Sequence, residues 1–338
     1  MDHIRPVISD VVPTIANPPR SEAQGRLVAR FVAEVQLAAV VNLVAAIEAF
    51  SGKPIVVDRA IVMAVVLRGA PEFRCESTGL ACSGGDRDYA ISINAIAASL
   101  GRPFETVRRH VNGLIDSGLC VRTPRGIIVA PGLADAPVMQ QMIRDLHDLM
   151  VRLIDYATRH GVHVPIKRSD LPYQPSATIA ATLDLVLASV EYLEPHYGDW
   201  LEMAVVNATI AANARPVTFD PVLAIRYAAT DAVPPRHLRR AVSVTGLARA
   251  LRMPYSTVQR QVKASILRGQ LERVPGGIMI TQEQLDADGV RVAGPAAVSR
   301  ALRAFGRLVP GGFPFDDPPS CYMTGPPALL DFGDGVPV

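Results

Sequence analysis

The stretch SINAIAASLGRPFETVRRHVNGLIDSGLCVRTPRGIIVA, residues 92–130, occurs twice in the chain in related form. Residues 243–281 read SVTGLARALRMPYSTVQRQVKASILRGQLERVPGGIMIT, and an ungapped alignment that starts at Ser92 and Ser243 makes 14 of the 39 positions identical. Unrelated segments would match at only a few positions, so we infer an internal duplication. Residues 92–130 are named the first unit below, and residues 243–281 the second unit. The identical pairs include Ala97/Ala248, Leu100/Leu251, Pro103/Pro254, Thr106/Thr257, Arg109/Arg260, Gly118/Gly269, Arg122/Arg273 and Gly126/Gly277.

The similarity continues upstream of the two units. GKPIVVDRAIVMAVV, from Gly52, resembles ARPVTFDPVLAIRYA, from Ala214, at a larger offset than the one between the units. The first copy therefore contains an insertion, which we place near residues 70–91. Long helices are expected to open the copies, around residues 22–50 and 178–212, and to close them, around residues 136–160 and 295–308.

The length of 338 residues exceeds what one hydrophobic core usually serves, so two domains are the starting expectation. Residues 165–178, PIKRSDLPYQPSAT, lack helical periodicity and resemble a linker. Residues 309–338 contain seven Pro and five Gly, and we expect them to be extended or disordered. The predicted organisation is a first repeat over residues 1–164, a linker over 165–177, a second repeat over 178–308 and a tail over 309–338.

Each unit begins with the pattern of two helices joined by a tight turn. Ser92 and Ser243 suit the N-cap position, and apolar residues follow them at helical spacing. Gly101 can adopt the left-handed conformation that ends the first helix, and Pro103 suits the start of the next. The second helix should run to about Ser117. Its buried face would hold Val107, Val111 and Leu114.

A short hairpin is expected after each second helix. LCVRTPRGIIVA and LERVPGGIMIT each contain two β-prone runs joined by a turn with Pro and Gly. Polar side chains on the second helices and hairpins can contact base edges or phosphates. The candidate DNA-binding residues are Arg102, Glu105, Thr106, Arg108, Arg109, Arg122, Arg125, Tyr255, Ser256, Thr257, Gln259, Arg260, Lys263 and Arg273.

Plainer roles compete with DNA contact at several positions. Arg102, Arg108 and Arg249 are equally consistent with charges on a solvated helix surface. Phe104 and Tyr255 are expected to pack at the start of the second helices rather than to touch bases.

The order of helices and hairpin resembles the MarR-type winged helix-turn-helix regulators, and the units themselves resemble winged-helix proteins broadly. The resemblance implies a homodimer held by terminal helices, with one recognition helix per subunit. Since this chain holds two copies, one polypeptide could supply both halves as a pseudo-dimer. The second unit departs from the pattern at Arg252, where the turn glycine is absent. It also departs at Ser265 and Gln270, where apolar residues are usual.

Basic charge is concentrated in two windows. The whole chain has a formal net charge of +2, but residues 92–130 carry +3 and residues 236–281 carry +8. The rest of the chain must then carry −9. This distribution is what binding to a polyanion requires. The scarcity of lysine beside arginine, with abundant Ala and Val, is typical of GC-rich bacterial genes.

Other sites have weak support in the sequence. Cys75 and Cys82 lie too far apart for a usual zinc knuckle, and His160 with His163 adds no second cysteine pair, so no metal is expected. A redox role for either cysteine is a minor alternative. No nucleophile elbow, phosphate loop or HExxH motif occurs, which predicts a protein that is not an enzyme and has no cofactor.

The scattered cysteines and the absence of a signal-peptide pattern predict a cytoplasmic protein. No membrane span is expected, because Gln36, Asn42 and Glu48 interrupt the most apolar run, residues 35–50. The cluster Tyr192, His196, Tyr197 and Trp200 is either ordinary core or the lining of a pocket for a small-molecule effector.

The sequence thus predicts a mainly α-helical chain with small β wings, in which two tandem winged helix-turn-helix repeats form an internal pseudo-dimer with long helices at the junction. The predicted function is a sequence-specific regulator of transcription that binds double-stranded DNA, as a monomeric pseudo-dimer or a homodimer. A plasmid-type replication initiator is the alternative within DNA binding. A protein-interaction adaptor that no longer binds DNA is the alternative from another class.

Overall fold

The computed structural model of the protein describes residues 24–70, 89–162, 164, 171–193, 197 and 199–333, with the backbone alone at residues 191–193 and 288–295. The chain is mainly helical and carries two small antiparallel sheets, which confirms the coarse prediction of fold class. The helices are α2 (Gly25–Ser51), α3 (Val57–Gly69), α5 (Ile93–Ser99), α6 (Phe104–Asp116), α7 (Pro137–Arg159), α8 (Pro175–Leu193), α9 (Trp200–Thr218), α10 (Pro221–Arg226), α11 (Val244–Ala250), α12 (Tyr255–Leu267), α13 (Gln282–Asp286) and α14 (Asp288–Leu308). The strands are β1 (Cys120–Thr123), β2 (Gly126–Val129), β3 (Leu271–Val274) and β4 (Gly277–Ile280), and short 3-10 turns are η2 (Leu133–Asp135), η4 (Arg236–Leu238) and η5 (Pro318–Cys321).

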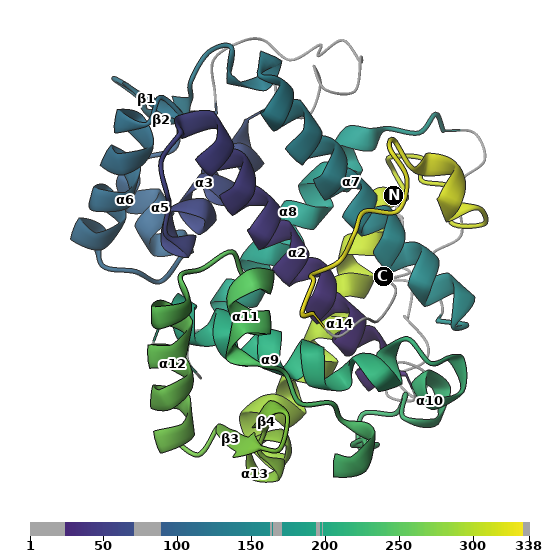
Figure 1. Ribbon diagram of the computed structural model, residues 1–338. Coiled ribbons are helices and arrows are strands. Elements are labelled where there is room, and N and C mark those ends of the chain that lie inside the picture. Colours follow the sequence, from purple (N-terminus) through teal and green to yellow (C-terminus); the bar gives the residue numbers. More distant parts are fainter. Residues whose placement is uncertain are drawn as a thin grey trace, which may run out of the picture.

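Helix α2 lies at the centre of the molecule, and α7, α8, α9 and α14 pack around it (Figure 1). These helices come from both copies, and one continuous cluster of buried apolar residues joins them. At the middle of α2, Glu34 is buried and accepts hydrogen bonds from Arg215 of α9 at 2.9 and 3.1 Å. The two copies therefore share a core instead of forming separate globules.

In the described part of the chain, α2 is the one helix long and apolar enough to cross a membrane by length and composition. Most of its apolar window is buried inside the protein, and it carries the ion pair between Glu34 and Arg215. Both features are those of a core helix.

Two of the expected long helices differ from the prediction. The helix expected over residues 178–212 is two helices, α8 and α9, and Pro195 and Gly198 in the intervening sequence explain the break. Asp199 caps the start of α9 by accepting a hydrogen bond from the backbone N–H of Glu202 at 2.7 Å. The closing helix of the second copy, α14, begins at Asp288 rather than near residue 295.

The two units have the same local structure. Helices α5 and α11, helices α6 and α12, and the hairpins β1–β2 and β3–β4 each occupy matching positions in the alignment of the two units. Ser92 and Ser243 cap their helices as predicted, by accepting hydrogen bonds from Ala95 N–H at 3.1 Å and Gly246 N–H at 2.9 Å. The residue before each N-cap serine also pairs with the hairpin of its own unit, Ile91 with Ile127 and Val242 with Ile278.

The turn between the two helices keeps its shape although its residue differs. Gly101 has φ 62°, and Arg252 at the matching position has φ 53°. Among the described residues, Arg252 is the one non-glycine residue with a positive φ. A side chain in this left-handed region costs about 1 kcal/mol. In the second unit, an arginine therefore adopts a backbone conformation that favours glycine.

The similar stretches upstream of the two units, from Gly52 and from Ala214, differ in structure. Helix α3 has 13 residues, whereas α10, in the matching stretch, has six. The first unit packs on α3 through α6 and β2. The second unit instead packs on α9, where the Asn213 side chain accepts from Ile280 N–H and donates to the carbonyl of Arg240.

The C-terminal segment, expected to be extended or disordered, packs on the protein over its described part, residues 309–333. Residues 309–333 are irregular apart from η5, but the rings of Phe313, Phe315 and Phe332 are buried. Buried Asp148 of α7 accepts hydrogen bonds from the backbone of Met323 and Thr324 at 2.9 and 2.8 Å. The segment follows the protein surface as a packed strap, because aromatic residues among the prolines supply the apolar area that disordered tails lack.

Candidate nucleic-acid interface

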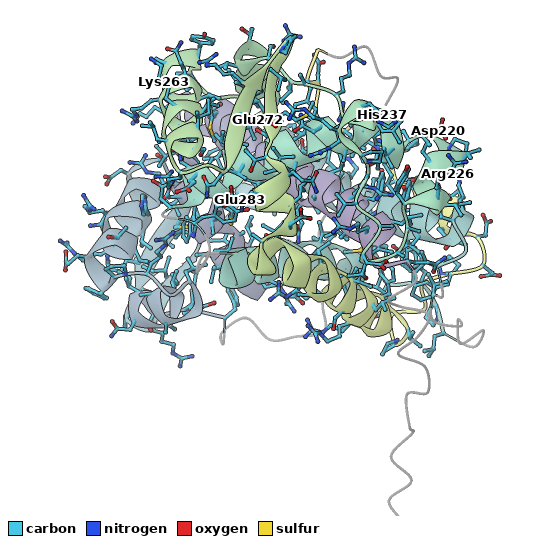
Figure 2. All side chains as sticks on the ribbon, turned by 90° about the horizontal axis from the view of Figure 1, so that it is seen from below. Asp220, Arg226, His237, Lys263, Glu272 and Glu283 are labelled. Carbon is cyan, nitrogen blue, oxygen red and sulfur yellow. The ribbon has the colours of Figure 1, made fainter. Side chains whose placement is uncertain are left out.

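The second helices of the two units, α6 and α12, lie on the same side of the molecule. In Figure 1 this is the left side, where the hairpin β1–β2 and helix α6 lie above helix α12, and the hairpin β3–β4 lies at the bottom, nearer the middle. Figure 2 shows the molecule from below, with α12, marked by Lys263, at the upper left and Glu272 of β3 nearer the middle. The helices are thus central and the hairpins are at the two ends of this face.

Helix α6 buries one face and presents charges on the other. Val107, Val111 and Leu114 are at most 1% exposed, as predicted. Arg109 is exposed, and Thr106 is half-buried. Exposed Arg108 and Glu105 form an ion pair at 2.7 Å, and hydrogen bonding to Glu105 raises the pKa of Arg108. The pair leaves Arg109 as the main unneutralised cation among the candidates on this helix.

Arg102 has a different place from the predicted one. Its guanidinium lies over the ring of Trp200, with its carbon 4.6 Å from the ring centroid, and one terminal nitrogen is buried. A guanidinium on an indole face is held by a cation–π interaction. The residue joins the turn of the first unit to α9, which favours a structural role over DNA contact for its guanidinium.

Helix α12 presents a more open polar face. Ser256, Arg260 and Lys263 are exposed, and Thr257 and Gln259 are half-buried. Lys263 lies at the outer edge of the molecule in Figure 2. Gln259 donates a hydrogen bond to the hydroxyl of Tyr255 at 3.2 Å. These side chains supply donors and acceptors on one exposed helix face.

The hairpins carry arginines next to the helices. Arg122 is exposed on β1 and donates to the Asn112 side chain of α6 at 3.1 Å, which ties the hairpin to the helix. Arg125 is exposed in the turn between β1 and β2, where its backbone N–H donates to Thr123 Oγ1. Arg273 is exposed on β3.

The aromatic residues at the start of the second helices correct another expectation. Phe104 is 42% exposed and Tyr255 is 49% exposed, so neither is packed as predicted. They occupy the same position in the two units. An aromatic residue at the same position of both units was the sequence signal for a shared role of Phe104 and Tyr255.

Ion pairs reduce the positive charge of the second window. Arginines of residues 236–281 pair with carboxylates that lie outside the second helix and mostly far away in sequence. The pairs are Arg236–Glu272 at 3.0 Å, Arg249–Asp331 at 3.5 Å, Arg252–Glu48 at 3.9 Å and Arg268–Glu202 at 3.0 Å. The net charge of +8 already counts Glu272, but Asp331, Glu48 and Glu202 lie outside the window, so +8 overstates the charge on this face. That charge depends chiefly on Arg260, Lys263 and Arg273.

The structure offers no alternative metal centre among the described residues, where no group of three metal-ligating side chains occurs. Cys75, Cys82 and His163 lie outside the described residues. Cys120 and Cys321 are buried, and burial raises the pKa of the Cys120 thiol to about 12.

The structure describes the side chains of two of the four residues in the predicted aromatic cluster. Tyr197 and Trp200 line a cavity of about 330 Å³ between α2 and α9. The side chains of Tyr192 and His196 lie outside the described residues. The cavity adjoins the second unit, since it is also lined by Leu251 and Met253 of the turn between α11 and α12.

Comparisons of the chain with models of protein families, with curated protein sequences and with solved structures found no match. Function is therefore inferred from the residues and their geometry.

Proposed function

We propose that the protein is a sequence-specific regulator of transcription that binds double-stranded DNA through both units, each acting as a winged helix-turn-helix. The observation that carries the proposal is the presence of two matching helix-turn-helix-hairpin units with α6 and α12 exposed on one side of the molecule. This is the arrangement by which dimeric regulators place two recognition helices on one duplex. Here both helices belong to one chain, which would act as a bacterial, cytoplasmic pseudo-dimer without enzymatic activity.

The dimensions of the helices suit a DNA groove. Each second helix has 13 residues, or roughly 20 Å at 1.5 Å per residue, and the major groove of B-DNA admits an α-helix. Arg109 and Arg260 occupy the same position on the exposed faces and are the leading candidates for reading bases. Arg122, Arg125 and Arg273 on the hairpins would hold phosphates or enter the minor groove.

The two helices would read different half-sites. In the alignment of the two units, RPFETVRRHVN of the first matches MPYSTVQRQVK of the second, and Glu105 corresponds to Ser256. The preferred site should be an imperfect palindrome with half-sites about 34 Å apart. A perfectly symmetric site preferred over every asymmetric variant would contradict this.

The proposal is tested by fluorescence anisotropy with random and genomic duplexes at two salt concentrations. The test variant is Arg109→Ala/Arg260→Ala, and Arg144→Ala/Arg159→Ala on α7 is a control with the same change in charge. We expect the logarithm of the binding constant to fall with the logarithm of salt by roughly 0.9 per phosphate neutralised. Only the test variant should lose the binding.

The alternatives give different results in the same assay. Binding that is absent, or equal in the test variant and wild type, would overturn DNA reading by α6 and α12 and favour a protein-interaction adaptor. Selection of repeated origin sequences instead of promoter fragments would favour a replication initiator.

A further inference from the structure

The cavity between α2 and α9 is long and mostly apolar. One stripe of α2 lines it from Arg26 to Val44, and one stripe of α9 lines it from Trp200 to Ala214. At 1.5 Å per residue these stripes extend roughly 27 and 21 Å. The Arg26 end of α2 lies beside the Ala214 end of α9, because Arg26 N–H donates to the carbonyl of Ala228, which follows α9 in the chain.

The end near Ala214 contains a cation without a carboxylate partner. Arg30 of α2 donates to the carbonyls of Tyr227 at 2.7 Å and Ala224 at 3.2 Å, but its Nε is buried without an acceptor. Burial lowers the pKa of Arg30 to about 10. An unpaired charge is costly in such surroundings, and a bound carboxylate would compensate it.

Two further residues of the cavity lining contain buried polar atoms without partners. Trp200 is 2% exposed and its Nε1 donor has no acceptor, while Gln270 is 8% exposed and its Oε1 has no donor. Both residues line the cavity. Leaving such atoms unsatisfied costs about 1–3 kcal/mol each, and a hydroxyl group can both accept and donate a hydrogen bond.

We propose that this cavity binds a linear amphipathic carboxylate with a hydroxyl group at its far end, one molecule per chain. The carboxylate pairs with Arg30, the apolar chain lies between α2 and α9, and the hydroxyl accepts from Trp200 or donates to Gln270. Cavities of this size with a few convergent polar groups are typical of ligand sites.

The first unit lacks the polar end of such a site. Gln270 corresponds to Leu119 in the alignment of the two units, and Leu119 is fully buried among apolar residues. The asymmetry between the copies therefore predicts one site per chain and not two.

Occupation of the cavity would affect the turns of both units. Trp200 supports Arg102 of the first unit, and Leu251 and Met253 belong to the turn of the second. A ligand effect on DNA affinity follows from these contacts and rests on the proposed function. Ligand binding itself does not, and it is tested without DNA.

The test uses Trp200, which is the single tryptophan of the chain. Its fluorescence is titrated with ω-hydroxydodecanoate, dodecanoate and dodecanol against the full-length protein. We expect a saturable change with ω-hydroxydodecanoate, and at least about tenfold weaker binding of dodecanol, because it lacks the carboxylate. Dodecanoate should bind several-fold more weakly because it lacks the hydroxyl.

Two variants assign the ends of the site. Arg30→Met should weaken the carboxylates but not dodecanol, whereas Arg159→Met, on the exposed side of α7, should change nothing. Gln270→Leu, which installs the residue of the first unit, should abolish the preference for the hydroxylated ligand; thermal unfolding checks that each variant is folded. Absence of a saturable change, or equal affinity for all three ligands, would overturn the proposal even if DNA binding holds.

Discussion

The first and second units reach the same backbone with different residues at the positions that usually specify it. The turn contains Gly101 in one and Arg252 in the other, at φ 62° and 53°. The core positions filled by Leu114 and Leu119 in the first unit hold Ser265 and Gln270 in the second, and both of those side chains contain a buried atom without a hydrogen bond. The first unit thus has the residues that usually stabilise this backbone of two helices and a hairpin. The second carries destabilising residues that its neighbours must offset.

The supports of the two units explain how this difference is tolerated. The first unit rests on α3, a complete helix in which Ala60 and Met63 are fully buried. The corresponding residues of α10, Val222 and Ile225, are 64% and 63% exposed. The second unit instead depends on α9 and on the strap, where the carbonyl of Phe332 lies so close to Gly246 that a Cβ there would be 2.3 Å away.

The largest effect should come from exchanging the core residues. Leu119→Gln places an amide in an apolar core with no partner, and we expect the free energy of unfolding to fall by about 3 kcal/mol. Gln270→Leu removes an unsatisfied amide and should leave stability unchanged or raise it by up to about 1 kcal/mol. Urea denaturation of the two variants measures both changes.

Similar losses in Leu119→Gln and Gln270→Leu would contradict this assignment. They would mean that Gln270 forms an interaction that stabilises the protein as much as Leu119 does.

Single replacements on the second helices should distinguish the half-sites. Arg109→Ala and Arg260→Ala should each weaken DNA binding by about 5- to 100-fold, and unequally, because the surrounding side chains differ. Anisotropy on one selected duplex, and on the same duplex with either half-site changed, measures the loss and its location. Equal and negligible losses would remove both residues from the interface.

The turn offers a smaller and cleaner comparison. Arg252→Gly relieves the left-handed strain and should raise the free energy of unfolding by about 1 kcal/mol. The exposed ion pair with Glu48, at 3.9 Å, adds little that would be lost. Gly101→Arg is the reciprocal variant and should destabilise by a similar amount. No change in either variant would mean that the strain is compensated locally.

The smallest effect concerns the dependence of stability on pH. His110 of α6 matches Gln261 of α12, and burial lowers the pKa of His110 below its ordinary value of 6.5. Asp58, at 4.0 Å, and Arg59 and Arg109 act on it in opposite directions. Because the unfolded chain takes up the proton first, His110 costs stability as the pH falls below 6.5. His110→Gln should therefore reduce the loss of stability between about pH 8 and 5.5, measured by urea denaturation; an unchanged loss would contradict the depressed pKa.

Local features were predictable from the sequence because their causes lie within a few residues. The serine caps, the turn at Gly101 and the hairpins follow from capping and turn chemistry, and the structure contains them where expected. Long-range features were not predictable in the same way. Arg102 packs on Trp200, and the partners of Arg249 and Arg252 are Asp331 and Glu48, so none of these three contacts has a local signal. The sequence predicted an extended or disordered tail but not the packing of the strap, because its prolines and glycines outweighed its aromatic residues.

In the proposed complex, one chain supplies both DNA-reading helices. Hydroxyl-radical footprinting of the protein on a selected duplex, together with native mass spectrometry of the same complex, tests this arrangement. We expect one chain per duplex and two protected patches on one face of the DNA, about one helical turn apart. Two chains per site, or a single protected patch, would show that the units do not act as a pair within one chain.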